Sequence, residues 1–141
     1  MTRDEVLERL RVLADAEAKA GMARFGIETR QALGVTDAVR LAREANAGMR
    51  IEIEVTAVEE ARQALAAGAD ELLLDNMPLE MMREVVALAA ACDPRPALEA
   101  SGGITLANAR AVAETGVDYI SMGAITHSAP ALDLSLEVAA Q

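Results

Sequence analysis

Short apolar runs alternate with longer helix-like stretches from Arg50 to the end of the chain, and this alternation is the strongest limit on the fold. The predicted strands are 51–55, 71–75, 97–100 and 119–122, and the predicted helices are 59–67, 78–91, 106–114 and 131–140. Strands begin every 20 to 26 residues or so with a helix between them, as in parallel βα units. The sequence therefore predicts an α/β fold of about four βα units.

The region before these units is expected to be helical. Residues 3–20 place apolar side chains at mostly helical spacing among charges, and Thr2 and Glu5 have the spacing of a capping box. The segment 21–27 is expected to break this helix, and a second helix is predicted to run from Thr36 to about Asn46. One or two helices thus precede the βα units.

An internal repeat links two of the βα units. The segments 61–70 and 109–118 share Ala-Arg, a glycine six residues later and an aspartate two residues after that, and each precedes a predicted strand. Duplication of a quarter-barrel would produce this repeat. The packing requirements of any helix-Gly-strand turn would produce it equally well, and both explanations remain open.

Two glycine-containing turns are the candidate ligand sites. Ser101-Gly102-Gly103 follows one predicted strand, and Gly123 follows the next strand, four residues before His127. Glycine lets an anion approach backbone N–H groups and the positive end of a following helix, so phosphate is the expected ligand. The alternative is that these glycines only terminate strands.

Carboxylates stand near the ends of three predicted strands. These are Glu54, Asp75 and Glu99, of which Glu99 lies just before the Ser-Gly-Gly turn. Ligands of parallel α/β proteins bind at the carboxyl edge of the sheet, where Glu54 and Asp75 would face the glycine turns. Two acids opposite a phosphate suggest Mg²⁺ bridging carboxylate and phosphate oxygens. Alternatively, Glu52 and Glu54 form the solvated face of an edge strand.

The chain has one histidine, His127. A single histidine is usually structural, but its place after Gly123 would also allow it to donate a hydrogen bond to a phosphate. Asn76 and Ser128 are further candidates for the lining of the same site.

Charge and composition exclude several classes of function. A net charge of −10 argues against nucleic-acid binding, which depends on a basic surface. Because Lys19 is the sole lysine, an anionic ligand would be held by arginines, backbone amides or a metal ion. The single cysteine, Cys92, excludes an internal disulfide and is expected to be structural. No signal peptide or membrane-spanning run is recognised, so the cytoplasm is the expected location.

Five motifs together resemble one enzyme family. They are Ile-Glu-Ile-Glu-Val (51–55), Leu-Leu-Asp-Asn-Met (73–77), Leu-Glu-Ala-Ser-Gly-Gly-Ile-Thr (98–105), Glu-Thr-Gly-Val-Asp-Tyr-Ile-Ser-Met-Gly-Ala (114–124) and Thr-His-Ser-Ala-Pro-Ala-Leu-Asp (126–133). From about Thr36 to Val138 the chain resembles the C-terminal half of the barrel domain of nicotinate-nucleotide diphosphorylases (carboxylating), or quinolinate phosphoribosyltransferases. The resemblance implies a parallel (βα) half-barrel over residues 36–141, with 1–35 as an N-terminal helical segment.

The resemblance also implies roles for individual residues. Glu54 and Asp75 correspond to the acids that hold ribose hydroxyls and Mg²⁺ in that family. The phosphate-binding residues correspond to Ser101, Gly102, Gly103, Gly123 and His127. The implied reaction forms nicotinate mononucleotide, CO₂ and pyrophosphate from quinolinate and phosphoribosyl pyrophosphate in NAD biosynthesis.

Departures from the family pattern suggest an incomplete catalyst. Members are about twice as long and carry an arginine and lysine cluster for quinolinate that has no counterpart here. Residues 28–35 stand in place of an expected Lys-Asp-Asn-His motif, and residues 4–35 weakly resemble the start of helical-repeat DNA alkylation repair proteins. A chimera or a non-catalytic half-barrel scaffold with a phosphate pocket is the alternative. Four βα units cannot close a barrel, so a homodimer or higher oligomer is expected.

Overall fold

The computed structural model describes residues 22–25, 34–45 and 48–126. Its strands are β1 (Met22–Phe25), β2 (Arg50–Val55), β3 (Glu71–Asp75), β4 (Ala97–Ser101) and β5 (Tyr119–Ile120). Its helices are α3 (Val35–Ala45), α4 (Val58–Ala66), α5 (Leu79–Ala90), α6 (Ala109–Ala113) and α7 (Gly123–Thr126). The strands and helices alternate along the chain from β1 onward, as expected for βα units.

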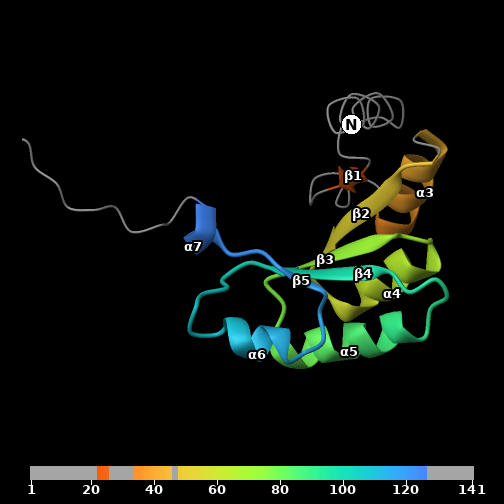
Figure 1. Cartoon of the computed structure of the whole chain (residues 1–141). Helices are drawn as coiled ribbons and strands as arrows, with labels where there is room; N and C mark the ends of the chain where they lie inside the picture. The colour runs from red at the N-terminus through yellow and green to blue at the C-terminus, as the bar shows by residue number, and fades with distance from the viewer. Residues whose placement is uncertain (1–21, 26–33, 46–47, 127–141) are drawn as a thin grey trace, which may run out of the picture.

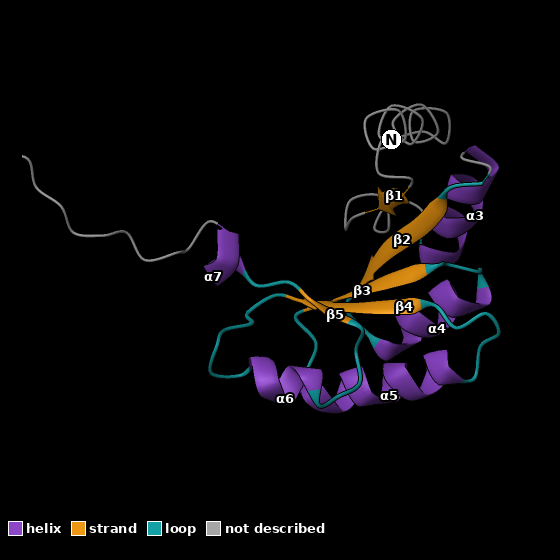
Figure 2. Cartoon of the chain, viewed as in Figure 1, coloured by secondary structure: helices purple, strands orange, loops and turns teal. Residues whose placement is uncertain are grey.

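All strand pairs are parallel, and the order in space is β1-β2-β3-β4-β5, the same as in the sequence. A sheet that always adds its next strand on the same side keeps its crossover helices on one face. Figures 1 and 2 show α4, α5 and α6 together beneath the sheet. This single winding is that of an open portion of a (βα) barrel. The predicted parallel α/β half-barrel is therefore confirmed.

The strand β1 differs from the sequence prediction. The sequence predicts only a helix break over 21–27, but residues 22–25 form a strand that pairs with β2 over four positions, from Met22 beside Arg50 to Phe25 beside Ile53. This pairing is non-local, so local patterning does not reveal it. The predicted helices over 3–20 and 131–140 lie outside the described residues. The resemblance of 4–35 to DNA alkylation repair proteins also falls mostly outside them and stays a prediction.

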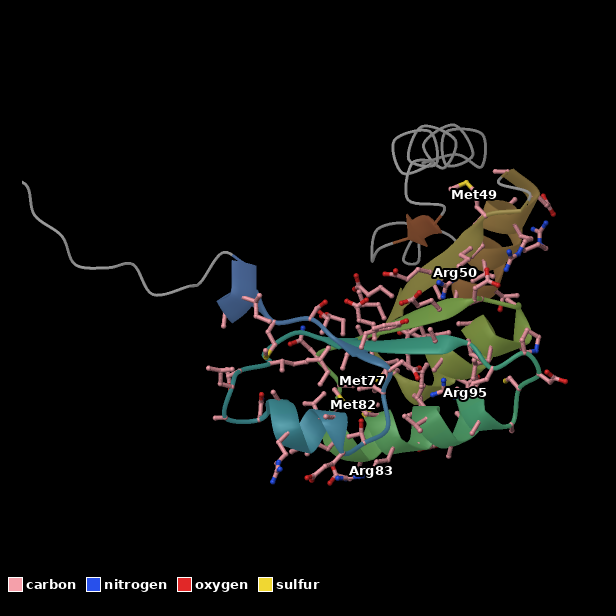
Figure 3. The ribbon with its side chains drawn as sticks, viewed as in Figure 1. Met49, Arg50, Met77, Met82, Arg83 and Arg95 are labelled. Atoms are coloured by element: carbon pink, nitrogen blue, oxygen red, sulfur yellow. The ribbon has the colours of Figure 1, made fainter. Side chains whose placement is uncertain are left out.

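The hydrophobic core lies between the sheet and its helices. Seven strand side chains in this layer are fully buried, at 0 % exposure: Ile51, Ile53, Val55, Leu72, Leu74, Leu98 and Ala100. The helices contribute small residues such as Ala61, Ala64 and Ala89, which let the helix backbones approach the sheet closely. Met77 and Met82 are also buried, and Figure 3 shows them between the sheet and α5. Among the described residues, the buried hydrophobic core thus consists of aliphatic side chains, alanines and methionines.

The internal repeat corresponds to a structural device at the amino ends of the strands. Asp70 Oδ2 accepts a hydrogen bond from Ile51 N at 2.7 Å, and Asp118 Oδ2 accepts one from Leu98 N at 2.8 Å. In return, the backbone N–H of each aspartate donates to the carbonyl of the same strand residue. Each aspartate thereby ties its helix-strand turn to the neighbouring strand. This common role is consistent with both explanations of the repeat.

Within the described part of the chain, no helix is long and apolar enough to cross a membrane.

Candidate functional site

The face of the sheet opposite the helices is polar. Side chains alternate along a strand, so residues between the buried apolar ones project from this other face. Glu54 of β2 lies beside Leu73 of β3, and Leu73 lies beside Glu99 of β4. Two residues further on, Asp75 lies beside Ser101. These residues share one face, and Asp75 and Ser101 stand at its carboxyl edge.

A hollow of about 620 Å³ opens at this carboxyl edge, beyond the ends of β4 and β5. It is lined by Ser101, Gly102, Gly103, Ile104, Thr105, Ile120, Ser121, Met122, Gly123 and Ile125. The structure thus brings together four of the five residues for which the sequence predicts phosphate binding. None of the described lining residues carries a charge. An anion here would be held by backbone N–H and hydroxyl groups.

The loop between β4 and α6 provides these backbone groups. Asn108 holds the loop together: its Oδ1 accepts from Thr105 N at 2.7 Å, and its Nδ2 donates to Gly103 O at 3.1 Å. The N–H groups of Gly102 and Gly103 make no hydrogen bond to another described residue. Among the described residues, nothing competes with a ligand for these two N–H groups.

The predicted helix 106–114 begins later than expected. Helix α6 starts at Ala109, because the chain forms a turn over 106–108 in which Asn108 closes back on the loop. Ala109 N donates to Thr105 O at 2.9 Å, so the chain already makes a helical turn between the glycine loop and α6.

Glu54 and Asp75 fit the requirements of a magnesium ion. Both are half-buried on the same face, on adjacent strands, two register positions apart. Mg²⁺ in substrate complexes usually takes one or two protein carboxylates together with phosphate oxygens, and this pair offers such a set of hard oxygen donors. The alternative that β2 is a solvated edge strand is wrong, because β1 covers its outer edge and Glu52 is only 3 % exposed.

A second group of acids is not evident from the sequence. Glu52, Glu71 and Glu99 are buried, and one carboxylate oxygen of each lies within 4.8 Å of the others. Arg50 Nη2 is 3.1 Å from Glu71 Oε2, and Ser121 Oγ donates a short hydrogen bond to Glu99. The three acids come from three strands, so their approach depends on register. The one sequence feature that could have indicated this cluster is that each of these three strands has a glutamate on the face away from the helices.

The remaining predicted residues, His127 and Ser128, lie outside the described residues.

A second hollow, of about 540 Å³, lies at the opposite, amino edge of the sheet. Arg50 and Arg95 line it, and Figure 3 shows both on the side of the sheet away from α7. Each guanidinium is already ion-paired, Arg50 with Glu71 and Arg95 with Asp118 at 2.9 Å. Because ligands of parallel βα proteins bind at the carboxyl edge, the first hollow is the candidate site.

The singly wound parallel sheet and the glycine-lined hollow define a class: a portion of a (βα) barrel that binds its ligand at the carboxyl ends of the strands. Comparison with known protein families shows which family of this class the chain belongs to. Residues 28–137 match the family described as "Quinolinate phosphoribosyl transferase, C-terminal domain". The chain belongs to this family, and the resemblance stated from its motifs is confirmed. The match begins before Thr36, where the motifs place the start of that resemblance.

Individual relatives agree with this assignment. The chain is 45 % identical over 109 residues to "Nicotinate-nucleotide pyrophosphorylase [carboxylating]" of Homo sapiens, covering 77 % of this chain and 37 % of the relative. A probable enzyme of that name from Bacillus subtilis is 43 % identical over 105 residues, covering 74 % and 35 %. A solved nicotinate-nucleotide pyrophosphorylase from Francisella tularensis superposes with a TM-score of 0.67 at 38 % identity, covering 79 % of this chain and 38 % of that one. The chain thus spans little more than a third of these relatives.

Proposed function

We propose that this chain provides the phosphoribosyl-binding part of a nicotinate-nucleotide pyrophosphorylase (carboxylating) active site. The proposed reaction joins quinolinate to the ribose of phosphoribosyl pyrophosphate, with release of pyrophosphate and CO₂. The observation that carries the proposal is the hollow at the carboxyl edge, in which Ser101, Gly102, Gly103 and Gly123 meet beside the strand end that bears Asp75. Membership of the family supports the choice of substrate.

The proposed roles follow from the chemistry of each group. The amides of Gly102 and Gly103 and the Ser101 hydroxyl would bind the phosphate, with Gly123 on the other wall and His127 as a further donor. Glu54 and Asp75 would hold the ribose hydroxyls and Mg²⁺. When bound, Mg²⁺ would neutralise negative charge on the departing pyrophosphate. Fixing ribose and phosphate together would orient the reacting carbon, and orientation of this kind removes a large part of a barrier.

The proposal is tested by calorimetry of phosphoribosyl pyrophosphate with and without Mg²⁺. Asp75→Ala is expected to lower the Mg²⁺-dependent affinity about tenfold or more, the loss typical of a charged contact of about 1.5–3 kcal/mol. It should leave the chain folded, because Asp75 ends a strand and is only half-buried.

Glu59→Ala is the matched control, since it removes the same charge from an exposed position in the first turn of α4. Its affinity should equal that of the wild type. Equal affinity in the Asp75→Ala variant as well would return Asp75 to a purely structural role.

A scaffold that binds phosphate without catalysis is the second candidate. It is favoured by the absence of any basic side chain among the described residues lining the hollow, because quinolinate carries two carboxylates. Both candidate functions use the same phosphate site, but only the first includes conversion of quinolinate.

We further propose that a second copy completes the barrel, and that the protein acts in the cytoplasm. Among the described strands, β1 and β5 each pair on one side only, and exposed strand edges promote association. A dimer or larger assembly is expected in light scattering at micromolar concentration. A monomer at every concentration would contradict this expectation.

A further inference from the structure

The residue between the acid and the glycine loop has an unusual backbone conformation. Asn76 has a φ of 52°, and it is the one non-glycine residue with positive φ in the described part of the chain. Its backbone N–H donates to Ser101 O at 2.9 Å, so the end of β3 is tied to the end of β4. Asparagine tolerates this left-handed region better than most residues, but glycine would occupy it at less cost. The side chain therefore needs an explanation of its own.

The Asn76 side chain contacts both halves of the candidate site. Its Nδ2 donates a hydrogen bond to Asp75 Oδ2 at 2.9 Å. Its amide also lies directly against Gly102: a Cβ on that glycine would be 2.5 Å from Asn76 Cγ and Nδ2 and 2.6 Å from Oδ1. A Cβ on Gly103 would be 3.8 Å from the same Oδ1. One planar amide thus separates the carboxylate from the loop and contacts each.

We propose that Asn76 is a positioning residue that couples the metal-binding acid to the phosphate loop. Its amide holds the Asp75 carboxylate in one orientation and sets how closely the Gly102-Gly103 backbone approaches β3. Both groups would then face the same phosphorylated sugar at a fixed separation. This inference rests on the proposed function for the identity of the ligand. The contacts of Asn76 with Asp75 and Gly102 are present without a ligand.

The contrasting explanation is that Asn76 merely forms a tight turn. The two are separated by Asn76→Gly, which keeps access to positive φ while deleting the amide. Gln63→Ala is the matched control, because it deletes the same kind of side-chain amide from an exposed position on α4. That helix packs against the face of the sheet opposite the candidate site, so the control leaves the surroundings of Asp75 and Gly102 intact.

The first measurement is the binding of inorganic phosphate and of phosphoribosyl pyrophosphate with Mg²⁺, by calorimetry on the full chain. Asn76→Gly is expected to weaken phosphate binding severalfold. It should also reduce the Mg²⁺-dependent gain in phosphoribosyl pyrophosphate affinity about tenfold, because Asp75 loses a hydrogen bond to its charged form. Gln63→Ala should match the wild type in both. Wild-type affinities in a folded Asn76→Gly variant would overturn the inference.

The second measurement is made without ligand, by amide ¹⁵N relaxation. Asn76→Gly should lower the order parameters of Gly102 and Gly103, while Gln63→Ala leaves them unchanged. If the wild-type chain binds neither probe, the proposed function fails, and the order parameters still decide the role of Asn76. Unchanged order parameters in Asn76→Gly would overturn the positioning role.

Discussion

Gly102→Val is expected to lower the affinity for a phosphorylated ligand by about a hundredfold or more, the largest effect on binding that one substitution should have here. Gly102 has a φ of +83°, a region that costs a β-branched residue of order 1–3 kcal/mol. Its Cβ would also lie 2.5 Å from the amide of Asn76. The loop must move away from β3 to relieve this overlap. Because about 1.4 kcal/mol is tenfold in affinity, the strain and the lost amide contacts together account for the predicted loss.

The control for this prediction is Gly68→Val. Gly68 has a φ of +82°, nearly the same as that of Gly102, but nothing lies within 4 Å of the position a Cβ would take. It lines the hollow at the amino edge instead. The control should therefore have a lower free energy of unfolding in chemical denaturation, because valine is strained at this φ, but an unchanged affinity for phosphate. NMR titration with phosphate should show shifts at the amides of Gly103 and Gly123 in the control and not in Gly102→Val. A Gly102→Val variant that binds as the control does would contradict a loop-based cradle.

The local elements could be predicted from sequence because their signals are local. The run of leucines in β3 and the glycine after α4 define a strand and a helix end without reference to the rest of the chain. The glycine turns could also be assigned to one edge of the sheet, because all parallel strands end there. The hollow that unites Ser101 with Gly123 follows from this rule.

The remaining features depend on contacts between distant segments. The strand β1 is defined by its pairing with β2, and Met22 to Phe25 have no pattern of their own. The buried cluster of Glu52, Glu71 and Glu99 depends on the register of three strands. The contact of Asn76 with Gly102 joins two loops that are far apart in sequence. In each case the residue type can be read from the sequence, but the residue that it contacts is determined by the topology of the sheet.

The purified chain by itself is expected to release no detectable CO₂ from quinolinate in the presence of phosphoribosyl pyrophosphate and Mg²⁺, even where it binds the phosphorylated sugar. Binding of that sugar needs chiefly loop amides, which retain affinity for phosphate without a basic surface. Turnover also requires a dianion to be held against the ribose carbon, close to Glu54 and Asp75. Leaving its carboxylates unpaired there would cost several kcal/mol, and each 1.4 kcal/mol or so is tenfold in rate.

Arg50, one of the described arginines, is poorly placed to supply the missing charge. Arg50 stands at the amino end of β2, away from the hollow, and is paired with Glu71. Arg24 lies on β1, and Arg30 falls outside the described residues. The assay is release of labelled CO₂ from carboxyl-labelled quinolinate, with the human nicotinate-nucleotide pyrophosphorylase as the positive control. Release by this chain that disappears in Glu54→Ala would show that the chain is a complete catalyst. Absence of release together with Mg²⁺-dependent sugar binding would mean that these 141 residues bind the sugar without the groups that turnover needs.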